Sequence, residues 1–379
     1  MINAYSLILF GYIALRLIFP LPTSLVAKFC AAIPVLLIAL KHYFFQHFFG
    51  GLSSPDLPRF VIILAGWLYA ILVFVFILLL MRDIAACALW LAARAGFSAG
   101  FSLVSVPVSL GIILLAVICA TYGVYEAIRH PDIKKMEITL ARLPKALDGM
   151  TIVQISDLHV NAFNPEHKVR SLVETVNALK PDLVLLTGDI VDGTVAKRQK
   201  DIEPLRTLRA RYGVFGSAGN HEYYSGFDAW RKKFAELGIH MLYNGHVTLS
   251  VNDQPLVLAG ITDPVAASFG KDVPNVSEAL AGAPEHALRI LMAHRPQEAN
   301  IHANAGIDLQ LSGHTHGGQI IGLNRIVARF NDNLLMGWYD IGYMKLYIST
   351  GISLWNGFPV RFGVPSEMPV IVLRARQSV

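Results

Sequence analysis

The distribution of apolar residues divides the chain into two parts with different periodicities. Up to residue 126 the sequence consists of long apolar runs with nine charged side chains. After that residue, short apolar strands alternate with amphipathic helices at a charge density that is normal for a soluble domain. The pattern predicts an all-α transmembrane domain over residues 1–126 and an α/β domain that follows it.

Four segments of the first part are long and apolar enough to cross a bilayer, which takes about 20 residues. Residues 60–81 and 95–125 carry no charge, whereas residues 2–19 and 25–45 have basic side chains near their ends. From such positions long basic side chains reach the lipid headgroups. Residues 84–95 are too short to span a membrane, and we expect them to form an interfacial helix or a loop.

The charge balance argues against a nucleic-acid partner, and the apolar segments favour a multi-pass protein of the cell membrane. From residue 127 onward, 26 basic and 24 acidic residues nearly cancel, so the surplus behind the pI of about 9.0 lies mostly in the membrane part. A cleaved signal peptide over residues 1–23 is disfavoured, because no basic segment precedes the apolar run and further apolar segments follow. With four spans, the basic residues favour a cytoplasmic C-terminal domain by a modest margin, whereas an odd number of spans would reverse the placement of one end.

Residues 127–136 are interpreted as a juxtamembrane linker, and the C-terminal domain is expected over residues 137–379. The basic cluster in the linker fits either a patch that faces anionic headgroups or a solvated segment. Helices are expected at residues 165–179, 203–212 and 227–237. Strands are expected at residues 150–156, 183–187, 214–217, 247–251, 255–259, 290–293, 308–312, 345–349 and 370–374.

Five short motifs with acid, amide or imidazole side chains follow predicted strands. They are Asp157-Leu158-His159, Gly188-Asp189-Ile190-Val191-Asp192, Gly219-Asn220-His221-Glu222, Ala293-His294 and Gly313-His314-Thr315-His316-Gly317-Gly318-Gln319. Ligands of α/β sheets gather at the carboxyl ends of strands, so these side chains could meet at one site. Alone, each motif is often a turn, a cap or a packing residue. All five in this order favour a metal site with oxygen and imidazole ligands.

The spacing within two of these motifs suggests how pairs of ligands reach one ion. In an extended segment, side chains two positions apart point to the same side. Asp157 and His159 are therefore expected to face one ion, and His314 and His316 likewise. Glycines beside the motifs let the backbone turn tightly.

Residues 137–379 resemble the calcineurin-like metallophosphoesterase superfamily, specifically its bacterial YaeI/YkuE-like branch. Besides the metal motifs, the similarity rests on the strings LPKALDGMTIVQISDLH, LLTGDIVDG, GSAGNHEYY and LQLSGHTHGGQI. The resemblance implies a four-layer α/β/β/α sandwich with a dinuclear metal centre. It does not extend to the membrane part.

By motif position, the resemblance also implies roles for individual residues. The first metal would be held by Asp157, His159, Asp189 and His316. The second would be held by Asn220, His294 and His314, together with Asp189 as a bridging ligand. His221 matches the family histidine near the leaving group, so Asp189 and His221 are the expected catalytic residues. The expected cofactors are two divalent ions, whose identity as Mn, Fe, Zn or a similar metal stays open.

Residues around these ligands have two interpretations each. Asp192 and Glu222 either support the site, with Glu222 orienting His221, or lie at the surface. Five further residues form either a substrate rim or contacts with lipid headgroups: Arg295, Trp338, Trp355, Phe358 and Arg361.

Together these features predict a membrane-anchored phosphoesterase that hydrolyses a phosphodiester or pyrophosphate bond. Two cations can neutralise such an anionic substrate and activate water near neutral pH. The membrane part suggests membrane lipids as partners and a phosphorylated small molecule or lipid as substrate. The alternative is a sensor or scaffold that binds a phosphorylated ligand with little turnover. A transporter is disfavoured, because the expected helices carry no acid or paired charges at their centres. The sequence indicates no oligomeric state.

Overall fold

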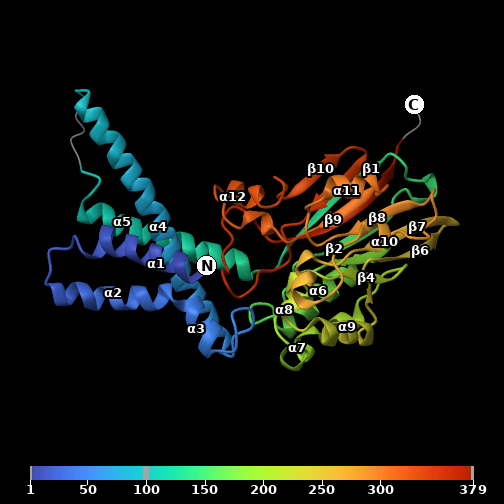
Figure 1. Ribbon diagram of the computed structural model, residues 1–379, viewed down its shortest axis with the longest axis horizontal. Helices are drawn as coiled ribbons and strands as arrows, with labels where there is room; N and C mark the ends of the chain where they lie inside the picture. Colours follow the sequence, from blue (N-terminus) through green and yellow to red (C-terminus); the bar gives the residue numbers. More distant parts are fainter. Residues whose placement is uncertain (1, 97–101, 377–379) are drawn as a thin grey trace. The chain divides into compact units, whose positions relative to one another are not determined.

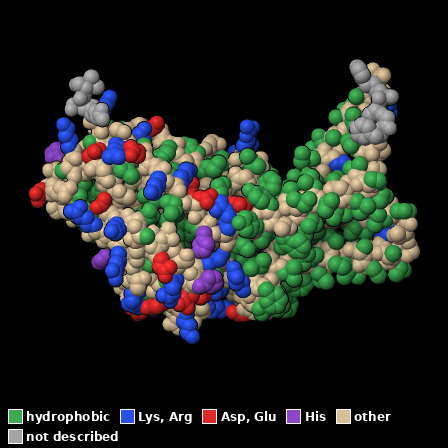
Figure 2. All heavy atoms as spheres, turned by 180° about the vertical axis from the view of Figure 1, so that it is seen from behind, with side chains coloured by type: hydrophobic (Ala, Val, Ile, Leu, Met, Phe, Trp, Pro, Cys, Tyr) green, Lys and Arg blue, Asp and Glu red, His purple; other side chains and the backbone are tan. Residues whose placement is uncertain are grey.

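The computed structural model describes residues 2–96 and 102–376, and the chain divides into two compact units (Figure 1). A helical unit comprises Met1–Glu126 with Asn356–Val360, and an α/β unit comprises Ala127–Trp355 with Arg361–Val379. Hydrophobic side chains dominate the visible surface of the helical unit, whereas charged side chains are scattered over that of the α/β unit (Figure 2).

Helices make up most of the described part of the first unit. In chain order they are α1 (Ile2–Ile13), the π-helical turn η1 (Ala14–Ile18), α2 (Leu25–Ala39), α3 (Lys41–Phe48), α4 (Arg59–Arg94) and α5 (Val106–Ile128). Of the described helices, α4 and α5 are each long and apolar enough to span a membrane. The pair α2 and α3 is a third candidate, bent by 55°, and Ala4–Ile18 is shorter than a span. Two of the four expected spans thus contain a continuous helix, namely residues 60–81 within α4 and residues 106–125 within α5, while residues 97–101 of the expected span 95–125 lie outside the described residues.

Helix α4 differs from the sequence-based expectation at its C-terminal end. Residues 84–95 were expected to be a separate interfacial helix or a loop, but α4 runs on without a break to Arg94. No glycine or proline interrupts residues 67–95, and alanine and leucine, which favour helices, are frequent after Asp83. At 1.5 Å per residue, the 36 residues of α4 extend about 54 Å, more than a bilayer's hydrocarbon layer requires.

Lys41 also differs from expectation, since its side chain does not reach outward from the helical unit. It is buried, and its Nζ donates a hydrogen bond to the backbone carbonyl of Gly357 at 2.7 Å. The same Nζ lies 5.0 Å from the ring centroid of Tyr69. An amine this deep needs such partners, because an unpaired buried charge is costly.

The second unit contains two six-stranded mixed sheets. The first sheet has the order β1 (Asp132–Leu140), β12 (Glu367–Ala375), β2 (Thr151–Ile155), β3 (Leu183–Thr187), β4 (Val214–Ser217) and β5 (His240–Met241). The second has the order β10 (Gly337–Ile341), β11 (Met344–Ile348), β9 (Leu309–Ser312), β8 (Leu288–Met292), β7 (Gln254–Gly260) and β6 (Gly245–Val251). Strands β2 to β5 are parallel, as are β7, β8, β9 and β11. The carboxyl ends of the parallel strands within each sheet therefore share one edge.

Three apolar cores show how the sheets and helices are layered. One core lies between the sheets and joins Leu183 of β3 to Leu258 of β7 and Leu311 of β9. A second joins the outer face of the first sheet to α6 (Glu166–Ala178), α7 (Val195–Ile202) and α9 (Phe227–Glu236). A third joins the second sheet to α10 (Val276–Ala279) and α11 (Ala299–Asn304). The predicted α/β/β/α order of layers is confirmed.

The remaining short elements are α8 (Asn220–Tyr224), α12 (Asn324–Arg329) and the 3₁₀ turns η2 (Lys145–Leu147), η3 (Glu203–Thr207), η4 (Pro264–Phe269) and η5 (His316–Gly318). The prediction of a helix at residues 203–212 is wrong, because α7 ends at Ile202 and only the 3₁₀ turn η3 follows it. Proline at position 204 has no N–H for the next helical hydrogen bond. Residues 132–136, expected as linker, instead form the first part of β1 and pair in parallel with β12.

Candidate metal centre

The residues of the five motifs lie at the carboxyl ends of parallel strands from both sheets. Asp157 and His159 follow β2, Asp189 and Asp192 follow β3, and Asn220 and His221 open α8 after β4. From the second sheet, His294 follows β8, and His314 and His316 follow β9. All of them are buried except His314, which is half-buried.

Three overlapping groups of these side chains place ligand atoms within 4.8 Å of one another. The groups are Asp157 with His159 and His316, His159 with Asp189 and His221, and Asp189 with His294 and His314. Asp189 belongs to two of these groups, so its carboxylate lies between His159 and His221 on one side and His294 and His314 on the other. Six of the seven residues expected to hold metal thus come together as one cluster.

Within the first group, two imidazole nitrogens face each other beside a carboxylate. His159 Nε2 lies 3.4 Å from His316 Nε2, which in turn lies 3.5 Å from Asp157 Oδ1. In the third group, His294 Nε2 lies 3.1 Å from Asp189 Oδ2. Imidazole and carboxylate ligands of this kind suit Mn, Fe or Zn.

Three of the expected ligands have a buried atom without a hydrogen-bond partner among the described residues. These atoms are Nε2 of His294, which contacts Asp189 Oδ2 without forming a hydrogen bond, Nδ1 of His316, and Oδ1 of Asn220, the seventh expected ligand. Buried polar atoms nearly always have partners, so an orphan at such a site indicates a missing ligand. A divalent cation would satisfy Nε2 of His294 and Oδ1 of Asn220, and the donor set therefore fits the metal centre that the motifs imply.

The backbone of the ligand loops is strained. Asp157, His159, Asp189, His314 and His316 all have positive φ, between 44° and 69°. Such a conformation is uncommon for residues other than glycine, and it concentrates at functional sites. The expectation that Asp157 and His159 share one side of an extended segment is wrong, and the same holds for His314 and His316. Left-handed turns after the strands aim these side chains.

Close approach explains two glycines of the motifs. A Cβ atom at Gly219 would lie 2.3 Å from Asp189 Oδ1, and one at Gly313 would lie 2.2 Å from Asp157 Oδ2. Gly351, which follows β11, has a φ of +85° and leaves room for Asp157 in the same way. No motif surrounds Gly351, so no local pattern predicts its role.

Two buried carboxylates support the ligand loops. Asp192 Oδ1 lies 2.5 Å from His221 Nδ1 and 3.2 Å from His159 Nδ1, so Asp192 orients both rings. Asn161, which no motif singled out, donates its amide to the other oxygen of Asp192 at 2.7 Å.

Glu222 has a different task from the one expected, since its carboxylate accepts backbone N–H groups and the orienting contact to His221 comes from Asp192. Its donors are the backbone amides of Asp189, Ile190, Val191 and Gly219, at 2.7 to 3.2 Å. Glu222 thereby ties the loop after β3 to the loop after β4. Burial and the nearby Asp189 carboxylate raise its pKa to about 7.

The electrostatics of the site separate the histidines into two kinds. Burial opposes protonation of His221, but the carboxylates of Asp189 and Asp192 outweigh it and raise the pKa to about 9. Burial and a neighbouring histidine instead hold the pKa values of His314 and His316 well below the usual range. A neutral imidazole offers the lone pair that a metal needs.

Two of the five residues considered for a substrate rim lie beside residues of the cluster or its loops. The ring centroid of Trp355 is 6.1 Å from that of His221. Arg295, next to His294 in the chain, pairs its Nε with Asp263 Oδ2 at 2.7 Å.

Of the other three, Arg361 and Trp338 do not form a rim around this cluster. Arg361 is fully buried, and its Nη2 donates to backbone carbonyls of residues 350 and 353. Trp338 packs against Tyr347 within the second sheet, with ring centroids 4.7 Å apart. Phe358 belongs to the helical unit.

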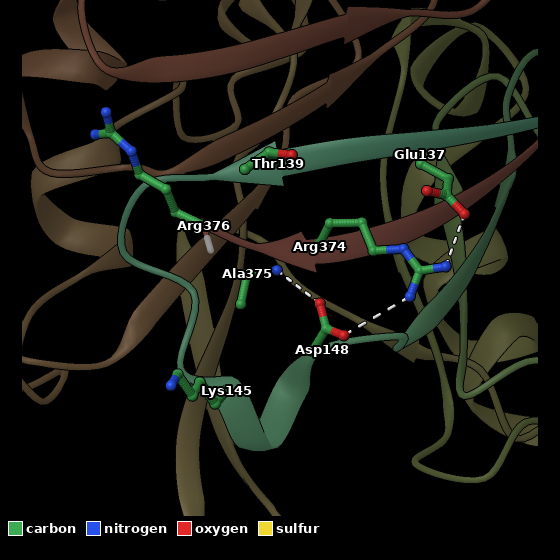
Figure 3. A pocket seen from close by; sticks show the side chains of 7 residues that line it. All are labelled: Glu137, Thr139, Lys145, Asp148, Arg374, Ala375 and Arg376. Carbon is green, nitrogen blue, oxygen red and sulfur yellow. Dashed lines mark hydrogen bonds and ion pairs between the residues drawn. The ribbon is translucent and has the colours of Figure 1, made fainter. Parts of the chain in front are cut away.

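A separate hollow of about 820 Å³ lies along β1 and β12 and contains none of the expected ligands. Arg374 lies across it and pairs with Glu137 at 2.7 Å and with Asp148 at 3.7 Å (Figure 3). Because these charges pair with each other, the hollow offers no comparable set of ligands.

Comparison with known proteins agrees with this geometry. A family model described as calcineurin-like phosphoesterase matches residues 150–318, a range that includes every expected ligand. The chain is 30% identical over 263 residues to the uncharacterized metallophosphoesterase YkuE of Bacillus subtilis, covering 67% of this chain and 90% of that protein. A solved calcineurin-like phosphoesterase, YfkN from Bacillus subtilis, overlaps 53% of this chain and 81% of its own at 18% identity and a TM-score of 0.36.

Some longer relatives are named as transmembrane proteins. The chain is 32% identical over 277 residues to a Danio rerio protein named transmembrane protein with metallophosphoesterase domain. That match covers 70% of this chain and 62% of the relative, so the chain spans less than two thirds of that protein's length.

Proposed function

Because the chain belongs to the calcineurin-like metallophosphoesterase family, we propose that it is a membrane-anchored, metal-dependent hydrolase of phosphoric esters. The observation that carries the proposal is the convergence of acid and imidazole side chains from five strand ends in one cluster. Strained loops and orphaned buried ligand atoms at the same place favour a catalytic centre over a packing role.

In this proposal the site holds two divalent cations. One would be bound by Asp157, His159, Asp189 and His316, and the other by Asp189, Asn220, His294 and His314. Mn, Fe or Zn would suit these ligands. When bound, such cations supply positive charge to the phosphoryl group and acidity to a water molecule.

The protein's own groups prepare the departure of the leaving group. Asp192 accepts a hydrogen bond from Nδ1 of His221, which leaves Nε2 as the nitrogen able to donate. The Asp192 carboxylate beside the ring raises the pKa of His221 and so favours its protonated form. His221 would pass this proton to the departing oxygen, as a general acid does.

The substrate that best suits this arrangement is a phosphodiester or pyrophosphate, carried by a lipid or a small molecule at the membrane surface. Helices α4 and α5, each able to span a bilayer, support the membrane placement. We place the α/β unit on the cytoplasmic side, as the distribution of basic residues favours.

The test is Mn-dependent release of nitrophenol from bis(p-nitrophenyl) phosphate by the full-length protein in detergent. We expect turnover that disappears with a chelator and returns with Mn. Release that is absent from metal-loaded protein, together with tight binding of a phosphorylated ligand, would favour the sensor or scaffold instead. Product masses from a panel of lipid phosphodiesters and nucleotide-linked lipids would then identify the substrate class.

A further inference from the structure

The helical unit contains an ionic cluster built around Asp83 of α4. Asp83 Oδ2 accepts hydrogen bonds from Tyr12 Oη and Arg16 Nε, both at 2.6 Å. Its other oxygen accepts from Arg82, at 2.9 Å from Nε and 2.7 Å from Nη2. One carboxylate therefore balances two guanidinium groups, and the cluster has an excess of one positive charge.

A cavity of about 280 Å³ adjoins this cluster within the helical unit. Arg16 and Arg82 line it together with Ser105 and Ser109 of the α5 region. Its remaining walls are apolar and include Leu17 and Leu110. The cavity thus combines a cationic part with a hydrocarbon-like part.

Arg82, which lines the cavity, has incomplete hydrogen bonding. Its side chain is 3% exposed, and its Nη1 has no hydrogen-bond partner among the described residues. A buried guanidinium N–H without an acceptor is costly, so a ligand with an anionic oxygen would be stabilised there. Guanidinium groups match the geometry of phosphate oxygens, to which they donate two parallel hydrogen bonds.

The cavity lies where apolar segments end along the chain. Arg82 directly follows the uncharged residues 60–81, Arg16 lies near the end of the first apolar segment, and Ser105 directly precedes α5. In a membrane protein, charged residues at the ends of apolar segments lie near the headgroups. The outward surface of α5 beside the cavity is apolar, since Leu110 and Leu114 are more than 60% exposed.

From these observations we propose that the cavity binds the phosphate of an anionic lipid. The guanidinium groups of Arg82 and Arg16 donate to the phosphate oxygens, while Leu17 and Leu110 contact the start of an acyl chain. The proposal rests on the membrane placement argued above, but it requires no turnover at the metal centre.

Native mass spectrometry of the full-length protein in detergent tests this site. Delipidated protein is mixed with dioleoyl phosphatidic acid, dioleoyl phosphatidylglycerol, dioleoyl phosphatidylcholine or inorganic phosphate. We expect one molecule of either acidic lipid to be retained per chain, at least about tenfold more than phosphatidylcholine. Equal retention of phosphatidylcholine would overturn the proposal, and so would retention of inorganic phosphate that blocks the acidic lipids.

Three variants locate the binding. Arg82→Gln should lower retention of the acidic lipids by about tenfold or more. Ser109→Phe should do the same by filling the cavity while it leaves the ionic cluster intact, so it decides the case if Arg82→Gln does not fold.

Arg94→Gln is the matched control, because Arg94 is on the same helix but is exposed and stacked on Trp90. Unchanged retention in Ser109→Phe, or an equal loss in Arg94→Gln, would place the lipid elsewhere. Because the readout is mass, its failure would leave the hydrolase proposal standing.

Discussion

Asp192 Oδ1 lies 2.5 Å from Nδ1 of His221, and this contact links a residue that binds no metal in our assignment to the expected proton donor. Asp192 is fully buried and also contacts His159, an expected metal ligand. The carboxylate thus fixes the ring orientation and the charge of His221 together. Removal of this carboxylate should change the protonation of His221 while the fold is retained.

Asp192→Asn should lower the pKa of His221. In metal-free protein the site raises this pKa to about 9, with the Asp192 charge as one of its causes. Without that charge the imidazolium is less stable, so deprotonation moves to lower pH. NMR titration of labelled histidine in chelator-treated protein checks the shift, and an unchanged pKa would contradict the assigned role.

His221→Ala should lower kcat by about 10²–10⁴, the usual contribution of a general acid. Metal content should stay at the wild-type level, since His221 is not an assigned ligand.

Asp189→Asn should lower turnover by several orders of magnitude and should also lower the metal content, because Asp189 is the assigned bridging ligand. Steady-state kinetics and elemental analysis of both variants separate these outcomes. Near wild-type turnover in the Asp189 variant would rule out the assigned bridge.

Glu222→Gln should weaken metal binding by about 10–100-fold, as is typical when a group that orients ligands is lost. Each oxygen of Glu222 accepts two backbone N–H groups, so the amide nitrogen of glutamine would face donors. Metal titration by calorimetry measures the effect. Glu236→Gln, on the exposed surface of α9, is the control and should bind metal like the wild type.

Gly219→Ala should disrupt the site by steric contact alone. The new Cβ would lie 2.3 Å from Asp189 Oδ1 and 2.8 Å from His294 Cδ2, so both ligands must shift. Overpacking of this kind costs about 1–3 kcal/mol, and the displaced ligands should also reduce turnover. Gly245→Ala is a matched control, since its nearest neighbouring atom is 3.9 Å away. Equal activity of the two variants would argue against the close approach at Gly219.

The sequence predicted the parts of the fold that have strong local patterns. Strands β3 and β4 have the bounds expected from short apolar runs that end at glycine or polar residues. The ligands could be placed at strand ends because their motifs follow those runs directly. Membership of the calcineurin-like family is confirmed by the relatives.

Other features depend on contacts that a local pattern does not contain. The first half of β1 is exposed and polar, so only its backbone pairing with β12 identifies it as a strand. The four backbone donors to Glu222 come from two separate loops. The left-handed turns at Asp157 and His159 likewise depend on contacts within the assembled site, since this conformation is uncommon for residues other than glycine.

In our assignment, seven side chains assemble around a pair of divalent cations. Anomalous diffraction from crystals of the full-length protein loaded with Mn locates these cations. We expect two anomalous peaks, one among Asp157, His159, Asp189 and His316, and one among Asp189, Asn220, His294 and His314. Crystals of Mn-dependent, active protein without anomalous density at these residues would contradict it.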